Sequence, residues 1–462
     1  MHRNGHAARA ERRSHPGGAG AFSPEIAYHA RQGNETERKL MSEMTTSQIK
    51  SKRILYLTLS TITLLFLGLI YAFSMFAAPM CKTFELEKTA VGLTFNIMMI
   101  TFCVGAVIGS QIEKKLGVKG SILVAAVMFA VGFIGTGLFA HSNVGALYLF
   151  YGIICGLGVG IGYNTVIATT NVWFPDKVGL SSGVLMMGFG LGSLTLGTLS
   201  VNLAASFGLE TVLIVVGIIS AIVIGAEGLI ISRPPANIVE LMAPEQASSS
   251  GYDPGDEDKA LKTPLFYVYW VWATIVIAIG LATIGNCSSD AQSVGWDAGF
   301  ATLLVGLVSA LNGVGRVIVG VIYDKTNVKV TMVIDGLVGV VAAVSIIAAF
   351  TMNVPVLYVI GAFCCGFCYG GVPVVASAFG RQRFGAKNYP LNLSLCNFAI
   401  VWGSILNVIL QAILGTDMRV ATFTVLAVMA VIAVLDAALP FAKMFERDKK
   451  MLAERKAAHE GK

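Results

Sequence analysis

Arg316 occupies the position in this sequence that most clearly implies chemistry. It lies about midway along 309–324, an apolar and glycine-rich stretch. A guanidinium at the centre of a bilayer costs about 2.5–3.5 kcal/mol on insertion scales, and it cannot avoid this cost by losing its proton. An arginine in such a place usually faces a water-filled cavity and binds an anion, and its planar group matches a carboxylate with two parallel hydrogen bonds. The alternative is a structural contact with an acidic side chain or with helix carbonyls.

Four polar side chains could complete a site for such an anion. Asn312 precedes Arg316 by four residues, so both lie on one face of a helix. It can orient the arginine or the anion, or it can be purely structural. Tyr71, Tyr163 and Tyr369 lie in three other apolar runs. Their hydroxyls could donate hydrogen bonds to a substrate oxygen, or they could bond to backbone carbonyls while the rings pack.

The composition indicates a membrane protein. The chain has 462 residues, of which 55% are hydrophobic and 13% charged, whereas soluble domains carry about 25% charged residues. Its net charge of +6 comes from short loops and tails, so it does not indicate a nucleic-acid partner. The eight cysteines lie in or beside apolar runs, which favours packing over a disulfide framework, a metal site or redox chemistry. We expect no cofactor and no metal.

Twelve apolar runs, each long enough to cross about 30 Å of hydrocarbon, predict an all-α protein with two pseudo-symmetric six-helix halves. The runs cover residues 54–80, 89–111, 119–140, 145–171, 179–205, 210–232, 264–287, 298–323, 329–350, 354–380, 388–414 and 419–441. We expect a disordered tail over 1–49, halves over 50–232 and 264–442, a flexible inter-half loop over 233–263 and an exposed tail over 443–462. The native chain could also start at Met41 or Met44.

Charge placement predicts the topology. With a cytoplasmic N-terminus, one side receives nearly all loop bases, as the positive-inside rule requires, so we expect both termini in the cytoplasm and the chain in the plasma membrane. Three acids, Glu227, Asp335 and Asp436, lie within about two helical turns of these bases, and we interpret them as their partners. The bases are Lys114, Lys115, Lys119, Lys177, Arg233, Lys325, Lys329, Arg381, Arg383 and Lys387.

Two similar loop segments, 109–119 and 320–329, follow the second and the eighth run. In the first segment Glu113 precedes Lys114, and in the second Asp324 precedes Lys325. A carboxylate that faces a helix N-terminus or an arginine of the other half could hold one conformation of a transporter and release it in another. We therefore predict a gate here, although the lysines alone could simply set the topology.

These motifs resemble those of a known family. The segment 320–329 is similar to the G-x-x-x-D-[RK]-x-G-[RK]-[RK] signature of the major facilitator superfamily, with Asn327 at the place of the later glycine, whereas in 109–119 Gly117 is displaced. The run W-F-P-D-K-V-G-L-S-S-G at 173–183, with the glycine-rich segment 156–163 and N-G-V-G-R at 312–316, resembles the oxalate/formate antiporter branch, which is related to monocarboxylate transporters. The resemblance implies transport of a small carboxylate by alternating access, with Arg316 as the clamp and the three tyrosines as walls.

Two departures from the family pattern refine this expectation. The oxalate-transporting type has a lysine in the eleventh span, but 390–414 contains no Lys or Arg, with Ile400 or a neighbour at that place. One cation suits a monoanion, so we favour a monocarboxylate such as formate, lactate or pyruvate. Asn312 stands where monocarboxylate relatives have an aspartate that resembles a proton carrier. Asp290 or Asp297 could replace it, although both could instead be solvated at the outer face.

The predicted function is secondary active transport, as an antiporter or a proton symporter. The expected partners are a small carboxylate, protons and the lipid bilayer, and we expect a monomer. One alternative is an oxalate or dicarboxylate antiporter in which water or a backbone dipole replaces the missing lysine. Another is a sensor that binds a carboxylate without moving it. An enzyme ranks last, because none of the six histidines lies deep in a span.

Overall fold

The structure, a computed structural model, describes residues 46–141, 143–235, 237–244, 253–284, 286–414 and 419–460. They belong to one compact unit, Thr46–Lys462. The described residues form helices and turns without a β-strand. Most of the tail expected over 1–49, with both alternative starts, lies outside the described residues, but helix α2 (Thr46–Leu67) begins within its last four residues.

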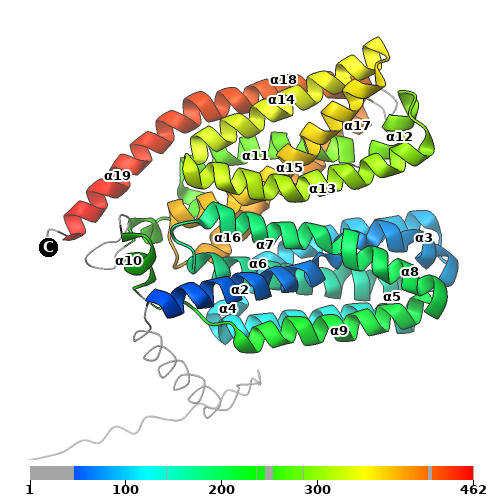
Figure 1. Ribbon diagram of the computed structural model, residues 1–462, viewed down its shortest axis with the longest axis horizontal. Coiled ribbons are helices and arrows are strands. Elements are labelled where there is room, and N and C mark those ends of the chain that lie inside the picture. Colours follow the sequence, from blue (N-terminus) through cyan, green and yellow to red (C-terminus); the bar gives the residue numbers. More distant parts are fainter. Residues whose placement is uncertain are drawn as a thin grey trace, which may run out of the picture. The chain divides into compact units, whose positions relative to one another are not determined.

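The first half consists of six spans, drawn in blue to green in Figure 1. Several spans change helix type along their length, so the element list is longer than the span list. After α2 come η1 (Gly68–Ala72), α3 (Phe73–Thr83), α4 (Lys88–Phe139), α5 (Val144–Leu147), η2 (Tyr148–Cys155), α6 (Gly156–Val172), α7 (Val178–Gly192), η3 (Ser193–Gly197), α8 (Thr198–Phe207) and α9 (Leu209–Ile230).

The second half repeats this pattern, drawn in green to red in Figure 1. Short helices link the halves: α10 (Ile238–Met242), η5 (Pro254–Glu257) and η6 (Ala260–Lys262). The half itself contains α11 (Pro264–Ile284), α12 (Cys287–Ser293), α13 (Ala298–Lys325), α14 (Val328–Met352), α15 (Pro355–Phe384), α16 (Tyr389–Asn397), α17 (Ala399–Leu414), α18 (Arg419–Asp436), η7 (Ala437–Phe441) and α19 (Ala442–Glu460).

The predicted twelve spans are confirmed. Eleven helical runs in the described residues are long and apolar enough to cross a membrane, and one of them, Ala90–Phe139, is 50 residues long. That run contains two spans, because Gly117 interrupts α4 with φ of 71° and ψ of 179°. A positive φ is readily adopted only by glycine, so the displaced glycine of the first loop motif is the residue that separates spans two and three.

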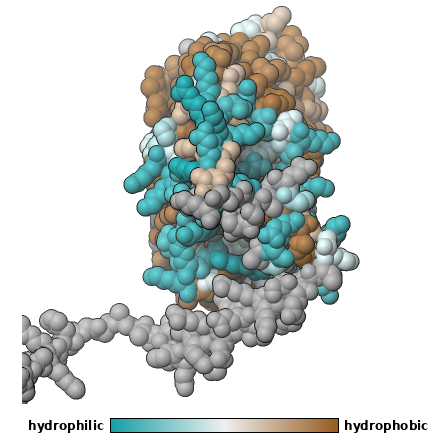
Figure 2. All heavy atoms as spheres, turned by 90° about the vertical axis from the view of Figure 1, so that its left-hand side faces the viewer, coloured by the Kyte–Doolittle hydropathy of each residue, from teal (hydrophilic) through white to brown (hydrophobic). Residues whose placement is uncertain are grey.

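The surface divides into an apolar belt and a polar end. Val127, Ile222 and Val408 are each more than 60% exposed, as expected for side chains that face lipid rather than water. Figure 2 looks along the bundle from the end where α10 and α19 lie, and hydrophilic residues gather on this face while apolar residues flank it. We call this face, which carries the loop bases, the basic end.

The segment between the halves is attached to both of them at the basic end. On the first half, Arg53 of α2 donates a hydrogen bond to the sulfur of Met242 at 2.9 Å. On the second half, Arg381 pairs with Asp253 at 3.5 Å. Buried Arg383 pairs with Asp258 of the segment at 2.9 Å and with Asp448 of α19, and Arg455 of α19 also pairs with Asp258. The described part of the C-terminal tail is thus a helix that the second half holds by ion pairs.

The two halves meet most closely where α7 crosses α13. Gly306, Gly313 and Gly320 are seven residues apart, so they lie along one face of α13. A β-carbon at Gly320 would lie 2.7 Å from the carbonyl carbon of Gly179, and one at Gly313 would lie 3.7 Å from Met187. A β-carbon at Gly306 would meet no atom within 4 Å. The two helices are therefore in backbone contact at the basic end and diverge away from it.

Because the spacing between α7 and α13 increases away from the basic end, replacing glycine by alanine should have opposite effects at the two ends of α13. Gly320→Ala would push a methyl group into the α7 backbone and should destabilise the protein by about 1–3 kcal/mol, as overpacking does. Gly306→Ala should be neutral or stabilise the protein by about 0.5–1 kcal/mol, since alanine is the better helix former. Thermal unfolding of the two purified variants measures this difference, and equal midpoints would contradict the described crossing.

Candidate functional site

Arg316 is buried where the two halves meet. Its side chain comes from α13 of the second half, and the residue is 5% exposed. Nε donates a hydrogen bond to Oδ1 of Asn312 at 3.1 Å, and Nη1 donates one to the carbonyl oxygen of Met186 on α7. No carboxylate among the described residues lies within 4.0 Å of the guanidinium. The positive charge is therefore bound only by neutral groups.

The guanidinium of Arg316 lies against a glycine of the first half. A β-carbon at Gly190 of α7 would lie 3.4 Å from Nη1 and 3.5 Å from Cζ of Arg316, which is ordinary van der Waals contact. Two of the five N–H donors of the arginine bond to Asn312 and Met186. The remaining donors can bind an oxygen ligand.

The three predicted tyrosines gather around the same charge. Tyr71 lies in η1, Tyr163 in α6 and Tyr369 in α15, and the charge of Arg316 acts on the hydroxyl group of each of them. Their hydroxyls form no hydrogen bond with another residue in the described part of the chain. The structure thus brings Arg316, Asn312 and the tyrosines together from both halves.

Two phenylalanines that the sequence analysis did not single out complete this cluster. The ring of Phe189 on α7 lies 4.7 Å from that of Tyr163 and 5.2 Å from that of Tyr71, between centroids. The ring of Phe102 on α4 lies 5.3 Å from that of Tyr163. Phe189 lies between Gly188 and Gly190 in a glycine-rich stretch of α7, and this spacing is a signal that the sequence offers. Nothing in the sequence distinguishes Phe102 from a phenylalanine that faces lipid.

The arrangement suits one small anion with an apolar part. It offers one permanent cation, hydroxyl donors and aromatic walls, and no acidic side chain among the described residues pairs with the cation. The groups come from both halves, so a bound molecule would contact both. The described residues contain no group of three or more His, Cys, Asp or Glu side chains placed to hold a metal ion. Chemically, the cluster can bind and orient a carboxylate, but it holds no nucleophile paired with a base.

The predicted gate residues occupy different environments. Asp324 of α13 accepts hydrogen bonds from the backbone N–H groups of Gly179 and Leu180, at 2.8 and 2.7 Å. It thus caps the N-terminus of α7 across the two halves. Glu113 is 5% exposed and pairs at 2.8 Å with Arg233, the first residue of the inter-half segment. Lys325 is the exposed last residue of α13. Of the three, only Asp324 has a described contact that joins the halves.

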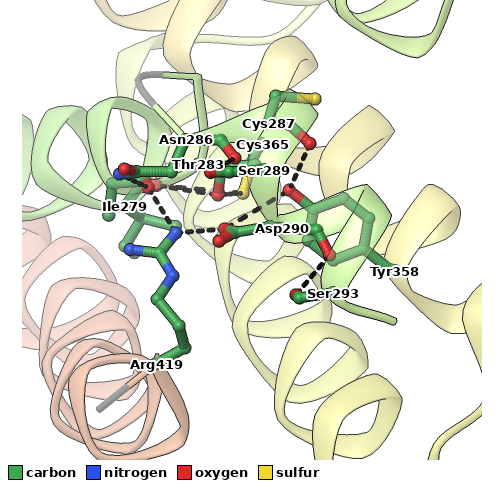
Figure 3. Close-up of polar contacts among 11 residues, drawn as sticks. Ile279, Thr283, Asn286, Cys287, Ser289, Asp290, Ser293, Tyr358, Cys365 and Arg419 are labelled. Atoms are coloured by element: carbon green, nitrogen blue, oxygen red, sulfur yellow. Dashed lines mark hydrogen bonds and ion pairs between the residues drawn. The ribbon is translucent and has the colours of Figure 1, made fainter. Parts of the chain in front are cut away.

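The candidate proton carriers Asp290 and Asp297 also differ from each other. Asp297 is exposed and caps α13 by accepting hydrogen bonds from Gly299 N and Phe300 N. Asp290 of α12 is 5% exposed and pairs with Arg419, as Figure 3 shows. Burial raises the pKa of Asp290 above its usual value, and the Arg419 guanidinium partly offsets that rise. The expectation of a solvated side chain is therefore wrong for Asp290.

A network around this ion pair holds one end of the second half together. The hydroxyl of Tyr358 on α15 donates a hydrogen bond to Asp290 at 3.4 Å, and Arg419 of α18 also donates to the carbonyl of Ala282 on α11. All four elements belong to one half, so the network does not have to break when the halves move. We interpret it as structural.

The three acids expected to pair with loop bases do not do so. Asp335 is 1% exposed and neither of its carboxylate oxygens has a hydrogen-bond partner. Glu227 accepts a hydrogen bond from Ser60, and one oxygen of Asp436 is buried without a partner. None of them forms an ion pair with a described base, so the interpretation is wrong. Among the loop bases, Arg233, Arg381 and Arg383 pair with other acids instead.

Two six-helix halves that share one buried binding cluster are the architecture of a secondary transporter. Residues 59–347 and 263–461 match the Major Facilitator Superfamily, and the chain belongs to this family. It is a multi-pass membrane transporter, not an enzyme. The resemblance to the major facilitator superfamily that the sequence motifs indicated is confirmed.

The relatives place the chain more closely. It is 27% identical to the oxalate:formate antiporter of Oxalobacter formigenes over 88% of this chain and 96% of that protein. It is 25% identical to the uncharacterised transporter YhjX of Escherichia coli (strain K12) over 78% of this chain and 88% of that protein. Among solved structures, the proton:xylose symporter XylE superposes with a TM-score of 0.68 at 14% identity, covering 84% of this chain and 95% of that one. This last likeness concerns the fold alone.

The Asp290–Arg419 pair allows a test of its structural role. Asp290→Asn would leave Arg419 buried without its carboxylate, and losing one partner of a buried pair costs about 3–5 kcal/mol. The double variant Asp290→Asn with Arg419→Gln should lose clearly less than the two single variants together. Thermal unfolding of all four proteins completes the cycle, and strictly additive losses would show that the two side chains do not interact.

Proposed function

We propose that the protein transports a small monocarboxylate, such as formate, lactate or pyruvate, across the plasma membrane by alternating access. It works as an exchanger or as a proton symporter, and as a monomer with both termini in the cytoplasm. The observation that carries this proposal is the buried Arg316 guanidinium, which has no acidic partner among the described residues. A mobile anion is the ligand that would neutralise it.

A carboxylate as the substrate is supported by the chemistry of the cluster and by a similar protein. A planar guanidinium binds a carboxylate through two parallel hydrogen bonds, which a simple halide cannot accept. Hydroxyls from three tyrosines can add hydrogen bonds to the same oxygens, and the rings of Phe102 and Phe189 suit a short apolar tail. The relative of Oxalobacter formigenes is named for oxalate and formate.

The preference for a monoanion rests on the count of cations. No Lys or Arg occurs in 390–414, and Arg316 is the cation of the cluster. A dianion would therefore retain one uncompensated charge in a site of low polarity. The alternative of an oxalate or dicarboxylate antiporter is favoured by the same relative, and the substrate screen below decides between them.

Alternating access requires contacts that can break at the basic end. The two hydrogen bonds from the α7 N-terminus to Asp324 are such contacts, because they join the halves next to the Gly179–Gly320 crossing. A carboxylate at a helix N-terminus contributes about 0.3–1 kcal/mol, which is small enough to be exchanged for hydration in each cycle. We propose that Asp324 stabilises the state that is closed at the basic end.

Ligand-dependent stability tests the role of Arg316. At a concentration of 100 times Kd, a ligand that binds only the folded protein stabilises it by about 2.7 kcal/mol. We expect formate, lactate or pyruvate to raise the thermal midpoint of the wild type and to have no effect on Arg316→Ala. Arg316→Lys keeps the charge but not the planar fork, so it should retain only weak binding.

Flux in proteoliposomes separates the remaining alternatives. Stabilisation without movement of labelled ligand would identify a sensor rather than a transporter. Strong stabilisation and flux with oxalate, but not with the monocarboxylates, would establish the dicarboxylate alternative. Stabilisation that persists in Arg316→Ala would place the binding site elsewhere.

The gate proposal predicts a local change at the start of α7. In Asp324→Asn the amide side chain offers one neutral oxygen instead of a charged carboxylate, so the backbone N–H groups of Gly179 and Leu180 should exchange faster with deuterium. Lys325→Gln alters the adjacent exposed charge and serves as the matched control. Exchange measured by mass spectrometry on both variants should differ in this segment alone, and an equal pattern would remove Asp324 from the gate.

A further inference from the structure

A second buried charge carrier lies behind the proposed substrate site. Asp335 is in α14, seven residues after its first residue, Val328, and therefore about 10 Å along the helix from the basic end. Its residue is 1% exposed, and both carboxylate oxygens lack a hydrogen-bond partner among the described residues. An ionised carboxylate so placed would lose its hydration without compensation, which is far costlier than burying the neutral acid. In this conformation the side chain therefore holds a proton.

Among the described residues, the surroundings of Asp335 contain no charged group that could replace that proton. From α15, the thiol of Cys368 and the bare backbone of Gly371 face the carboxyl group. From α11, Trp272 lies nearby, but its indole N–H donates to the carbonyl of Met332. Neither Arg316 on α13 nor any other described base lies within 4.0 Å of the Asp335 carboxylate, Asp436 lies at the end of α18, and η7 has no titratable residue.

Only the backbone of α15 separates this carboxyl group from the substrate site. A β-carbon at Gly370 would lie 3.1 Å from Oδ1 of Asn312, and one at Gly371 would lie 2.7 Å from Oδ1 of Asp335. Tyr369, one of the three tyrosines of the proposed substrate site, is the preceding residue. The glycine pair thus contacts Asn312 through Gly370 and the carboxyl group of Asp335 through Gly371.

This part of α15 is also the place where the helix can bend. Pro373 lies inside α15 and has no N–H group, so the carbonyl of Tyr369 lacks the usual donor four residues later. Prolines of this kind are a common cause of helix kinks. A bend between Tyr369 and Pro373 would move the tyrosine relative to Arg316 and at the same time change the packing of Gly371 on Asp335.

We propose that Asp335 is the proton-binding site that couples proton movement to carboxylate transport. This inference rests on the proposed function. The acid holds its proton while the basic end is closed. When α15 bends and the basic end opens, water reaches the carboxyl group, and the proton passes to that water as the monocarboxylate leaves Arg316. One proton and one monoanion then cross together without net charge, and no other reactant is required.

The structure favours Asp335 over the two carriers expected from the sequence. Asp290 is held by Arg419 and Tyr358 at the end of the molecule opposite the basic end, within one half. Asp297 is an exposed helix cap. The carboxyl groups of both aspartates are already bound by other groups, whereas that of Asp335 has no described partner. The three aspartates therefore form a natural set for one test.

The experiment compares Asp335→Asn with Asp290→Asn and Asp297→Asn in proteoliposomes. Two quantities are measured for each protein: exchange of labelled monocarboxylate without a pH gradient, and substrate-dependent proton movement with a trapped pH indicator. We expect Asp335→Asn to keep exchange and ligand-induced thermal stabilisation but to lose proton movement down to the level of empty liposomes. Asp297→Asn should keep both activities, and any folded Asp290→Asn protein should do so as well.

Each outcome is decisive. Proton movement that persists in Asp335→Asn would overturn the inference. A wild type that exchanges monocarboxylates without moving protons would also overturn it, but would leave the proposed function intact. A wild type that moves no carboxylate overturns the proposed function, and the inference falls with it. If Asp335→Asn does not fold, Asp335→Glu keeps a titratable group at a changed position, and a pH dependence of transport identical to that of the wild type would overturn the inference.

Discussion

The structure depends on holding one permanent positive charge in a site that water hardly reaches. Arg316 is 5% exposed, and its described contacts are an amide and a backbone carbonyl. Neutral dipoles lower the cost of burying the guanidinium without cancelling its charge, so the site keeps an affinity for an anion. A permanent acidic partner would have stabilised the empty protein and abolished that affinity. The absence of such a partner among the described residues is the physical basis of the transporter interpretation.

The packing of the two halves follows from the same requirement. The guanidinium extends from α13 to the backbone of α7, where it donates to the carbonyl of Met186 and lies against Gly190. Nearer the basic end, glycines let the same two helices touch through their backbones, and Asp324 joins them by hydrogen bonds. The binding cluster and the closed end are therefore parts of one helix crossing. Under the proposed function, a ligand that shifts Arg316 would act on the same helix crossing that Asp324 joins.

Much of this could be predicted from the sequence, because charge and hydropathy vary strongly along the chain. The spans and the place of Arg316 follow from local patterns, whereas for Asp324 the sequence left a helix N-terminus and an arginine of the other half as alternatives, because its partners Gly179 and Leu180 are about 145 residues away. The partner of Asp290 could not be predicted, because Arg419 is 129 residues away and only the fold brings them together. For Asp335, the sequence indicates how deep the residue lies in the membrane, but not whether its side chain points into the bundle or toward lipid. Helix α14 is apolar all round, so no periodic pattern indicates which side faces the bundle.

The anchoring of the inter-half segment sets a limit on how far the molecule can open. Met242 is held on the first half by Arg53, and Asp253 on the second half by Arg381. Ten residues, 243–252, connect these two anchor points, and a fully extended chain of that length reaches at most about 36 Å. The covalent tether therefore limits how far the two anchor points can separate. An engineered deletion within these residues would turn the tether into a mechanical stop.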